Sequence, residues 1–221
     1  MHQHKTMNNN NKINVLLADD HEVVRAGYCR LFEATPDITV VAEAENGESA
    51  YRQYFEYQPD VLVMDISMPG IDGLEASRKI LAKDRDAKIL IFSVYENEVY
   101  LTRALDLGVL GYITKRSASQ VMIDAVRKIA SGTSYVGQEM MTHLVKSRNS
   151  EDGDPISTLS PREFEVFLLL ADSKSVNEIA ELLNLSPKTV GHHYTHLKNK
   201  LGISDIAGLT RLAIRHGLMS A

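Results

Sequence analysis

The chain has 221 residues, of which 44% are hydrophobic and 24% are charged, and its formal net charge is −5. This length suits two domains, and the composition is typical of a soluble globular protein. The longest apolar run, 166–171, is far too short to cross a bilayer, and residues 1–12 lack the apolar core of a secretory signal. With a single cysteine as well, the sequence predicts a cytoplasmic protein without a membrane partner, and we expect residues 1–12 to form a disordered leader.

Short apolar runs alternate with amphipathic stretches over the first 130 residues. The apolar runs predict strands at 13–18, 38–42, 61–65, 88–93 and 110–114. The amphipathic stretches predict helices at 21–33, 47–57, 73–82, 97–107 and 118–131. Strands that alternate with helices in this way predict a doubly wound α/β domain, with a five-stranded parallel sheet and helices on both faces.

After residue 131 the alternation weakens, and the polar stretch SRNSEDGDPIS predicts a linker, which we place at 132–157. The remaining residues, 158–221, predict a small all-α domain. Its helices are expected near 161–172, 175–183, 186–201 and 205–216. Two of them begin at Ser-Pro pairs, and Ser160 with Glu163 forms a capping box. From Pro155 onward seven basic residues stand against six acidic ones, so the two modules differ in charge and are expected to differ in their partners.

Chemically active side chains stand at the carboxyl ends of the predicted strands. The first strand ends in Asp19 and Asp20, the third in Asp65, the fourth in Ser93 and the fifth in Lys115. Because parallel strands end at the same edge of a sheet, we expect these side chains to converge. Each alone has an ordinary explanation, such as a helix N-cap for Asp20, but together they indicate a site.

Two neighbouring carboxylates such as Asp19 and Asp20 repel by about 4 kcal/mol at ~4 Å and an effective dielectric near 20. A bound cation would offset this cost, and several carboxylate oxygens are the ligands that Mg²⁺ prefers. A carboxylate beside that cation can attack a phosphoryl group and hold it as an acyl phosphate.

Four motifs resemble the receiver domain of bacterial response regulators, and the resemblance covers residues 13–131. They are DDH at 19–21, MDISMPGIDG at 64–73, FS at 92–93 and GYITK at 111–115. The resemblance implies a flavodoxin-like fold and phosphorylation of Asp65 by a sensor histidine kinase. It also implies a bound Mg²⁺, with Mn²⁺ as the alternative ion.

The same resemblance implies a role for each matching residue. The metal would be placed by Asp19, Asp20, Asp65 and the backbone carbonyl of Ser67, with Asp19 acting through water. The phosphoryl group would be read by Ser93 and Lys115, and Tyr112 matches the aromatic residue that turns inward when the serine moves.

The predicted helix 186–201 contains three lysines and no acidic residue. At 100° per residue it has one apolar face, formed by Val190, Tyr194, Leu197 and Leu201. Its polar front and flanks carry the candidate DNA contacts Lys188, Thr189, His192, His193, Thr195, His196, Asn199 and Lys200. The second helix of a helix-turn-helix needs this arrangement, because its front meets base edges and its flanks meet phosphates. A solvated face of a helical bundle and a zinc site are the alternatives, but adjacent histidines do not share one face.

The stretches LSPREFEVFLLLADSKSVNEIAELLNLSPKTV and KLGISDIAGLTRLAIRHGL resemble the LuxR-type DNA-binding domain. Joined to a receiver, this domain places the chain near the NarL/FixJ group of response regulators, and VNEIAELLNLSPKTV resembles its GacA/UvrY/LetA branch. That branch implies a tripartite sensor kinase and control of genes for small regulatory RNAs. Two positions depart from the family, because Ser173 stands where Gly is usual and Gly191 stands where a long polar residue is common.

We therefore predict a two-component response regulator rather than an enzyme. Phosphorylation would change the receiver contacts and free or dimerise the tail, so that a homodimer reads promoter DNA. The sequence admits an unphosphorylated state that is closed over the recognition helix and one that is already dimeric. A Mg²⁺-dependent phosphatase would need an Asp-x-Asp signature, whereas Asp65 is followed by Ile66 and Ser67. A phosphorylation-controlled module whose tail binds another protein is the other alternative.

Overall fold

The computed structural model describes residues 12–96, 98–141, 155–183, 185–216 and 218–219. Almost all of the predicted leader and the middle of the predicted linker lie outside these residues. Within the described ranges, no helix combines the length and apolar character needed to span a membrane.

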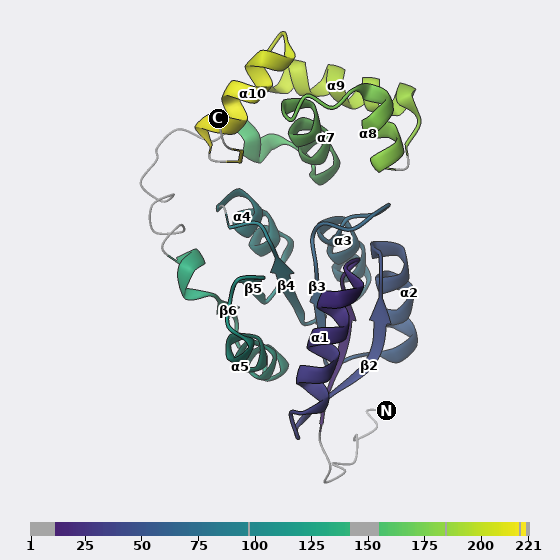
Figure 1. Ribbon diagram of the computed structural model, residues 1–221, viewed down its shortest axis with the longest axis vertical. Helices are drawn as coiled ribbons and strands as arrows, with labels where there is room; N and C mark the ends of the chain where they lie inside the picture. The colour runs from purple at the N-terminus through teal and green to yellow at the C-terminus, as the bar shows by residue number, and fades with distance from the viewer. Residues whose placement is uncertain (1–11, 97, 142–154, 184, 217, 220–221) are drawn as a thin grey trace.

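The N-terminal domain is a parallel sheet with the strand order β2-β1-β3-β4-β5-β6 (Figure 1). The strands are β1 (Ile13–Ala18), β2 (Ile38–Ala44), β3 (Val61–Met64), β4 (Ile89–Ser93), β5 (Gly111–Thr114) and β6 (Tyr135–Val136). The helices of this domain are α1 (Glu22–Glu33), α2 (Gly47–Tyr57), α3 (Gly73–Lys83), α4 (Glu98–Leu107) and α5 (Ser119–Ala130). Every strand and helix that the sequence predicts in this domain is present, and the doubly wound fold class is confirmed.

Side chains of the strands alternate between two apolar layers, as strands buried on both faces require. In β1, Val15 and Leu17 pack with α1 and α5 on one face of the sheet. Leu16 and Ala18 pack with α2, α3 and α4 on the other face. The central strands are thus held from both sides, and their carboxyl ends form a rigid platform for the polar side chains that follow them.

The sheet has one strand more than the five predicted. The extra strand β6 pairs with β5, with Gly111 opposite Tyr135 and Tyr112 opposite Val136. It lies inside the segment 132–157 that the sequence assigns to the linker, so the first domain extends past residue 131. Two residues are too short to show an alternating pattern, which is why the sequence does not reveal this strand.

The C-terminal domain is all-helical. It consists of the 3₁₀-helix η1 (Pro155–Thr158), α7 (Pro161–Ala171), α8 (Val176–Leu182), α9 (Pro187–Leu201) and α10 (Ile206–Arg215). Ser160, Ser175 and Ser186 cap the first three α-helices, each accepting a hydrogen bond from the amide three residues later. These caps explain why the predicted helix starts agree with the structure to within a residue or two.

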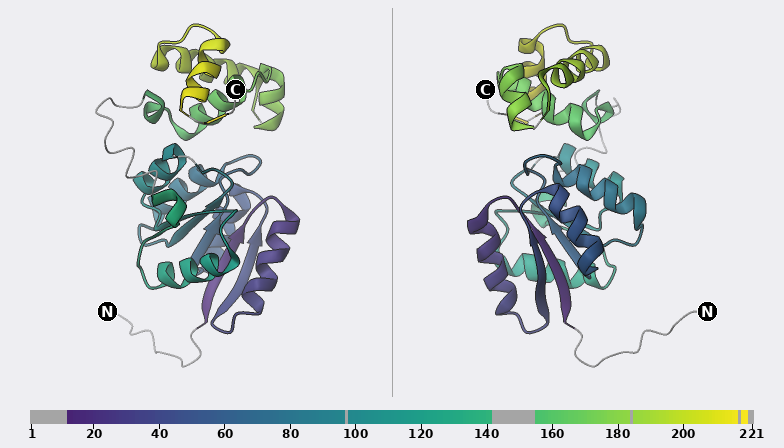
Figure 2. Two further views of the ribbon diagram at one scale, coloured as in Figure 1. Left: turned by 60° about the vertical axis from the view of Figure 1, so that its left-hand side comes forward. Right: turned by 90° about the vertical axis from the view of Figure 1, so that its right-hand side faces the viewer.

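The two domains lie against each other along the side of the receiver that carries α3 and α4 (Figures 1 and 2). The helical domain meets this side with α7 and η1. Helix α9 lies on the far side of the helical domain (Figure 1).

Candidate functional site

Three strand ends bring Asp19, Asp65 and Lys115 together, as the sequence predicts. Asp19 follows β1 and is fully buried, and Asp65 follows β3 with 1% of its surface exposed. Lys115 follows β5, and its Nζ lies 2.6 Å from Asp19 Oδ2 and 2.8 Å from Asp65 Oδ2. One ammonium group therefore neutralises part of the charge of two buried carboxylates.

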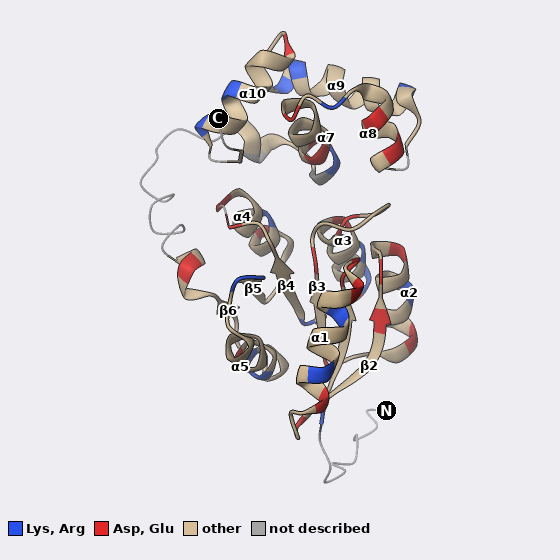
Figure 3. Cartoon of the chain, viewed as in Figure 1, with Lys and Arg blue, Asp and Glu red and all other residues tan. Residues whose placement is uncertain are grey.

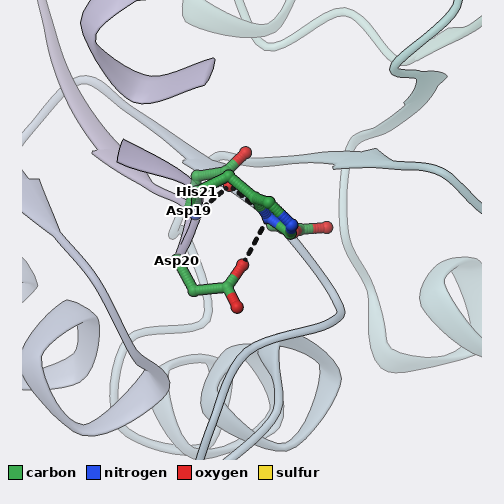
Figure 4. Close-up of side chains that lie close together, drawn as sticks. Asp19, Asp20 and His21 are labelled. Atoms are coloured by element: carbon green, nitrogen blue, oxygen red, sulfur yellow. Dashed lines mark hydrogen bonds and ion pairs between the residues drawn. The ribbon is translucent and has the colours of Figure 1, made fainter. Parts of the chain in front are cut away.

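Asp20 and His21 form the open side of this cluster. Asp19 Oδ1 accepts a hydrogen bond from the backbone amide of His21 at 2.9 Å, and His21 Nδ1 lies 2.7 Å from Asp20 Oδ1 (Figure 4). His21 rather than Asp20 is the N-cap residue of α1, and its side chain makes no capping bond. Asp20 is therefore not used as a helix cap, and its 31% exposed side chain is available to a ligand.

The electrostatics of the cluster centre on Asp65. Burial raises the pKa of Asp65 to about 6, against the opposing effect of Lys115. For Lys115, burial works against the charge, but its hydrogen bonds to Asp19 and Asp65 outweigh burial and raise its pKa. Among the described residues Asp65 Oδ1 has no hydrogen-bond partner. A buried carboxylate oxygen without a partner is costly unless something binds it.

The cluster fits a divalent cation. One ligand atom from each of Asp19, Asp20, His21 and Asp65 lies within 4.8 Å of the others. Hard carboxylate oxygens dominate this set, as magnesium prefers, and the unpartnered Asp65 Oδ1 points to an electrophilic partner. The candidate carbonyl ligand Ser67 and Asp20 both line one cavity of about 310 Å³.

A tight loop after β3 brings α3 close to the acidic cluster. Gly73 donates a backbone hydrogen bond to Ile66 O at 2.9 Å. A Cβ at Gly73 would stand 1.8 Å from the carbonyl oxygen of Asp65, so only glycine fits at this position. The glycine that ends the MDISMPGIDG motif therefore allows the start of α3 to pack directly against the backbone of Asp65.

Ser93 and Tyr112 lie next to each other beside the cluster. Ser93 is fully buried at the end of β4, and its Oγ accepts a hydrogen bond from Tyr95 N at 3.3 Å. The Tyr112 ring is also fully buried, and its hydroxyl donates to Tyr95 O at 2.8 Å. Burial raises the pKa of Tyr112, so its hydroxyl stays protonated and able to donate. The predicted switch residue is therefore in its inward position.

The sequence analysis missed an aromatic connection from these residues to the helical domain. The ring of Tyr95 stacks on Tyr100 of α4, with centroids 3.9 Å apart and planes 11° apart. Tyr100 in turn meets the edge of Phe164 of α7 at 5.0 Å. Within their own helices Tyr100 and Phe164 look like ordinary core residues, so no local signal in the sequence marks them.

Helix α9 presents the surface predicted to contact DNA. Its apolar back is buried at Val190 and Leu197. Five of the eight predicted contact residues are exposed and form no close ion pair with another described residue: Lys188, His192, Thr195, His196 and Asn199. Of these, His196 has its Nδ1 3.8 Å from Glu163 Oε1. Figure 3 shows lysines of α9 at the top of this domain, away from the receiver, and arginines of α10 along its left flank.

The remaining predicted contact residues, Thr189, His193 and Lys200, make contacts within the protein in this structure. Lys200 Nζ lies 2.6 Å from Glu163 Oε2, so its charge is engaged within the protein. His193 is half-buried, and burial, followed by the charge of Arg162, lowers its pKa. Thr189 is half-buried, and its hydroxyl lies 2.7 Å from the Ser186 hydroxyl at the start of the helix.

The three clustered histidines do not form a convergent metal site in the part of the chain that the structure describes. The rings of His192 and His196 are 4.3 Å apart, whereas His192 and His193 are 6.4 Å apart. The acidic cluster at the end of the sheet is therefore the better candidate for a metal.

Comparisons with known proteins agree with this architecture. Residues 15–127 match the response regulator receiver domain, and residues 157–213 match the bacterial regulatory proteins of the luxR family. The chain is 41% identical to the response regulator UvrY of Escherichia coli (strain K12) over 211 residues, which cover 95% of this chain and 97% of that protein. It is 37% identical to the response regulator GacA of Pseudomonas aeruginosa over 211 residues, which cover 95% and 99%.

A solved structure with both domains is also similar. RcsB from Salmonella enterica serovar Typhimurium, bound to promoter rprA in the presence of phosphomimetic BeF3−, matches with a TM-score of 0.65 and 30% identity. The match covers 92% of this chain and 99% of that one. The chain therefore belongs to the two-component response regulators of transcription that join a receiver domain to a LuxR-type DNA-binding domain, and its likeness to UvrY and GacA confirms the predicted branch.

Proposed function

We propose that Asp65 is the phosphoacceptor of this response regulator and that its phosphorylation by a partner histidine kinase controls the binding of promoter DNA. The observation that carries the proposal is the buried Asp65 carboxylate, which has one oxygen on Lys115 and its other oxygen without a hydrogen-bond partner among the described residues. A carboxylate held in this way has a nucleophilic oxygen ready and a cation in place for the product.

The chemistry follows from the placement of the residues. Asp65 Oδ1 attacks the phosphorus of a phosphohistidine, the new O–P bond forms as the P–N bond breaks, and the leaving imidazole recovers a proton from water. The ammonium group of Lys115 then offsets the negative charge of a phosphoryl oxygen, and the Ser93 hydroxyl donates a hydrogen bond to the phosphoryl group. Asp19, Asp20, Asp65 and the carbonyl of Ser67 would hold Mg²⁺ or Mn²⁺, which supplies charge neutralisation at the phosphoryl oxygens.

Helix α9 is the proposed reading element on DNA. Its exposed front would lie in the major groove, with Lys188 and His192 among the residues closest to the duplex. The similarity to RcsB bound to promoter DNA supports this role, and the similarity to a structure of RcsB dimers bound to DNA supports a homodimer on DNA. The resemblance to the UvrY and GacA branch extends the proposal to control of genes for small regulatory RNAs. With so few basic residues, binding should rest on few phosphate contacts.

The test is the intact mass of the protein after incubation with Mg²⁺ and acetyl phosphate, followed by a mobility shift with promoter DNA. The parent chain should gain one phosphoryl group and bind DNA more tightly, whereas Asp65→Asn should gain none. Asp86→Asn, which removes an exposed carboxylate elsewhere in the receiver, should behave as the parent does. An adduct on Asp65→Asn would place the phosphoacceptor elsewhere and contradict the proposal.

The same assay separates the two alternative functions. We infer that the chain is a regulator and not an enzyme, so the phosphorylated parent should bind DNA and should not turn over a generic phosphate ester. Turnover that requires Asp65 would favour the phosphatase, and phosphorylation without any change in DNA binding would favour a protein-interaction module.

A further inference from the structure

The DNA-binding domain is held against the receiver by specific polar and aromatic contacts. Arg103 of α4 donates a hydrogen bond from Nη2 to Ile156 O at 2.7 Å. Its guanidinium also lies over the ring of Phe164, 4.4 Å from the centroid. On the neighbouring side of the interface, Arg162 of α7 donates to the backbone carbonyl of Gly70 at 3.3 Å. These contacts define a closed arrangement of the two domains.

Two carboxyl groups meet in the middle of this interface. Asp72, the N-cap residue of α3, belongs to the receiver and is 3% exposed, and Glu165 of α7 belongs to the DNA-binding domain. Both side chains line one cavity where α3 and α7 meet, close enough for a hydrogen bond between the two carboxyl groups. Two carboxylates cannot form such a bond when both are ionised, because neither then has a hydrogen to donate. A hydrogen bond between these two carboxyl groups therefore needs one shared proton.

The cations near Asp72 and Glu165 do not fully neutralise the two carboxyl groups, because each cation is also bound to other groups. Arg162 is the closest cation, with Nη1 2.7 Å from Glu165 Oε2, but its guanidinium also serves the carbonyls of Gly70 and Leu183. From α3, Glu75 and Arg78 face the same region and are engaged with each other through two hydrogen bonds of 2.7 Å.

The hydroxyl of Tyr100 faces the pair from α4. Burial, followed by the neighbouring charge of Asp72, raises the pKa of Glu165 to about 8, and burial also raises the pKa of Asp72. The residues around the pair therefore favour its protonated form while the domains are in contact.

We propose that Asp72 and Glu165 form a proton-linked latch, which closes the DNA-binding domain onto the receiver when the pair binds a proton and opens when the pair loses it. The latch goes beyond the proposed function, because it acts on domain closure whether or not Asp65 is phosphorylated.

The direction of the pH effect follows from linkage. When the domains separate, both carboxyl groups are hydrated and ionise in their ordinary range near pH 4. When the domains close, the pair keeps a proton to a higher pH, so closing takes up about one proton in the window between. In that window the ratio of closed to open molecules should fall by up to about tenfold for each pH unit, and rising pH should open the molecule.

The experiment is small-angle X-ray scattering of the full, unphosphorylated chain without magnesium or DNA, at about pH 6 and about pH 8.5. The concentration is kept where light scattering shows a monomer. The radius of gyration of the parent should be larger at the higher pH. Glu165→Gln keeps the size and the hydrogen bonding of the protonated acid but cannot ionise, so it should stay compact at both pH values.

Two further variants make the result specific. Glu181→Gln removes an exposed carboxyl group of α8 and should reproduce the pH response of the parent. Asp72→Asn removes the receiver half of the pair while leaving a residue that caps α3 well, and it should also stay compact.

A parent whose radius of gyration does not change with pH would overturn the latch. So would a Glu165→Gln chain that expands with pH as the parent does, or one that is expanded at both pH values. Since no phosphoryl donor or DNA is present, none of these outcomes depends on the phosphoacceptor role of Asp65.

Discussion

At the scale of single residues, Ser173 shows how a departure from the family pattern is accommodated. It stands between α7 and α8 with a φ of +60°, in the left-handed region that favours glycine. The sequence analysis singled out this position because related domains usually have Gly there. The structure supplies the reason, because the chain must turn left-handed at this point.

We expect Ser173→Gly to stabilise the DNA-binding domain by about 0.5–1 kcal/mol, since relief of backbone strain exceeds the greater entropy of glycine in the unfolded chain. Scanning calorimetry should show a higher melting temperature for that domain. Gly132→Ala in the receiver is the control for the reverse change. Gly132 also has a positive φ, +81°, so alanine there should destabilise the receiver. A lower melting temperature for Ser173→Gly would mean that the serine side chain contributes more than the strain costs.

A second residue-scale prediction concerns Asp65. Its carboxylate is buried beside Asp19, and the two share one ammonium group. Asp65→Asn removes one buried negative charge, so in the presence of EDTA at neutral pH it should raise the free energy of unfolding by about 1–3 kcal/mol. Saturating Mg²⁺ should stabilise the parent and leave the variant almost unchanged, because ligand binding stabilises only the chain that binds. Urea denaturation with and without Mg²⁺ measures both effects, and a magnesium effect of equal size on the variant would argue against the acidic cluster as the metal site.

At the scale of elements, Glu163 joins two helices of the DNA-binding domain. It completes the capping box of α7 by accepting a hydrogen bond from Ser160 N at 2.8 Å, and it also accepts one from Lys200 Nζ near the end of α9. The sequence predicts the first role but not the pairing with Lys200, because pairing between helices that are distant in sequence has no local signature.

The pKa of Glu163 follows from these contacts. Burial works against its charge, but the hydrogen bonds from Lys200 and Ser160 outweigh burial and lower the pKa. A lowered pKa contributes stability above the unfolded value near 4.5, and this contribution is lost as the pH falls through the folded value. Glu163→Gln should therefore destabilise the domain by about 1–2 kcal/mol at neutral pH, and the difference from the parent should shrink below about pH 4. Calorimetry over a pH series measures this, with Glu181→Gln as the control that should show no such dependence.

Elements with strong local signals could be predicted from the sequence. The five predicted strands are short apolar runs, and the helix starts of the C-terminal domain are marked by Ser and Pro, so both agree with the structure. The edge strand β6 could not be predicted, because its two residues depend on pairing with Gly111 and Tyr112 for their conformation. The acidic site could be predicted because the topology of a parallel sheet brings strand ends together whatever their separation in sequence.

At the scale of the whole molecule, the relation between the two domains could not be predicted. Tyr100, Phe164 and Glu165 each fit the helical pattern of their own domain, and their roles become visible only when the surfaces meet. Substitution of Arg103 tests the contact between the domains most directly, because its hydrogen bond to Ile156 and its contact with Phe164 both cross the interface.

We expect Arg103→Ala to shift the chain toward open molecules, since it removes a charged hydrogen bond and a cation–π contact that together contribute about 1–3 kcal/mol to closure. Small-angle scattering at about pH 6, where the carboxyl pair favours closure, should show a larger radius of gyration than for the parent. Arg85→Ala, at an exposed position of the receiver, is the matched control. Equal radii for Arg103→Ala and the parent would show that these contacts do not hold the domains together.

The placement of α9 on the far side of its domain has a consequence for how control is exerted. Because closure leaves the exposed front of α9 uncovered, a closed molecule keeps its access to one half-site. What closure restricts is the freedom of two such domains to sit side by side at the spacing of a complete operator. Regulation then acts through avidity, in which joining two weak half-site contacts raises occupancy by orders of magnitude without a single new contact to DNA.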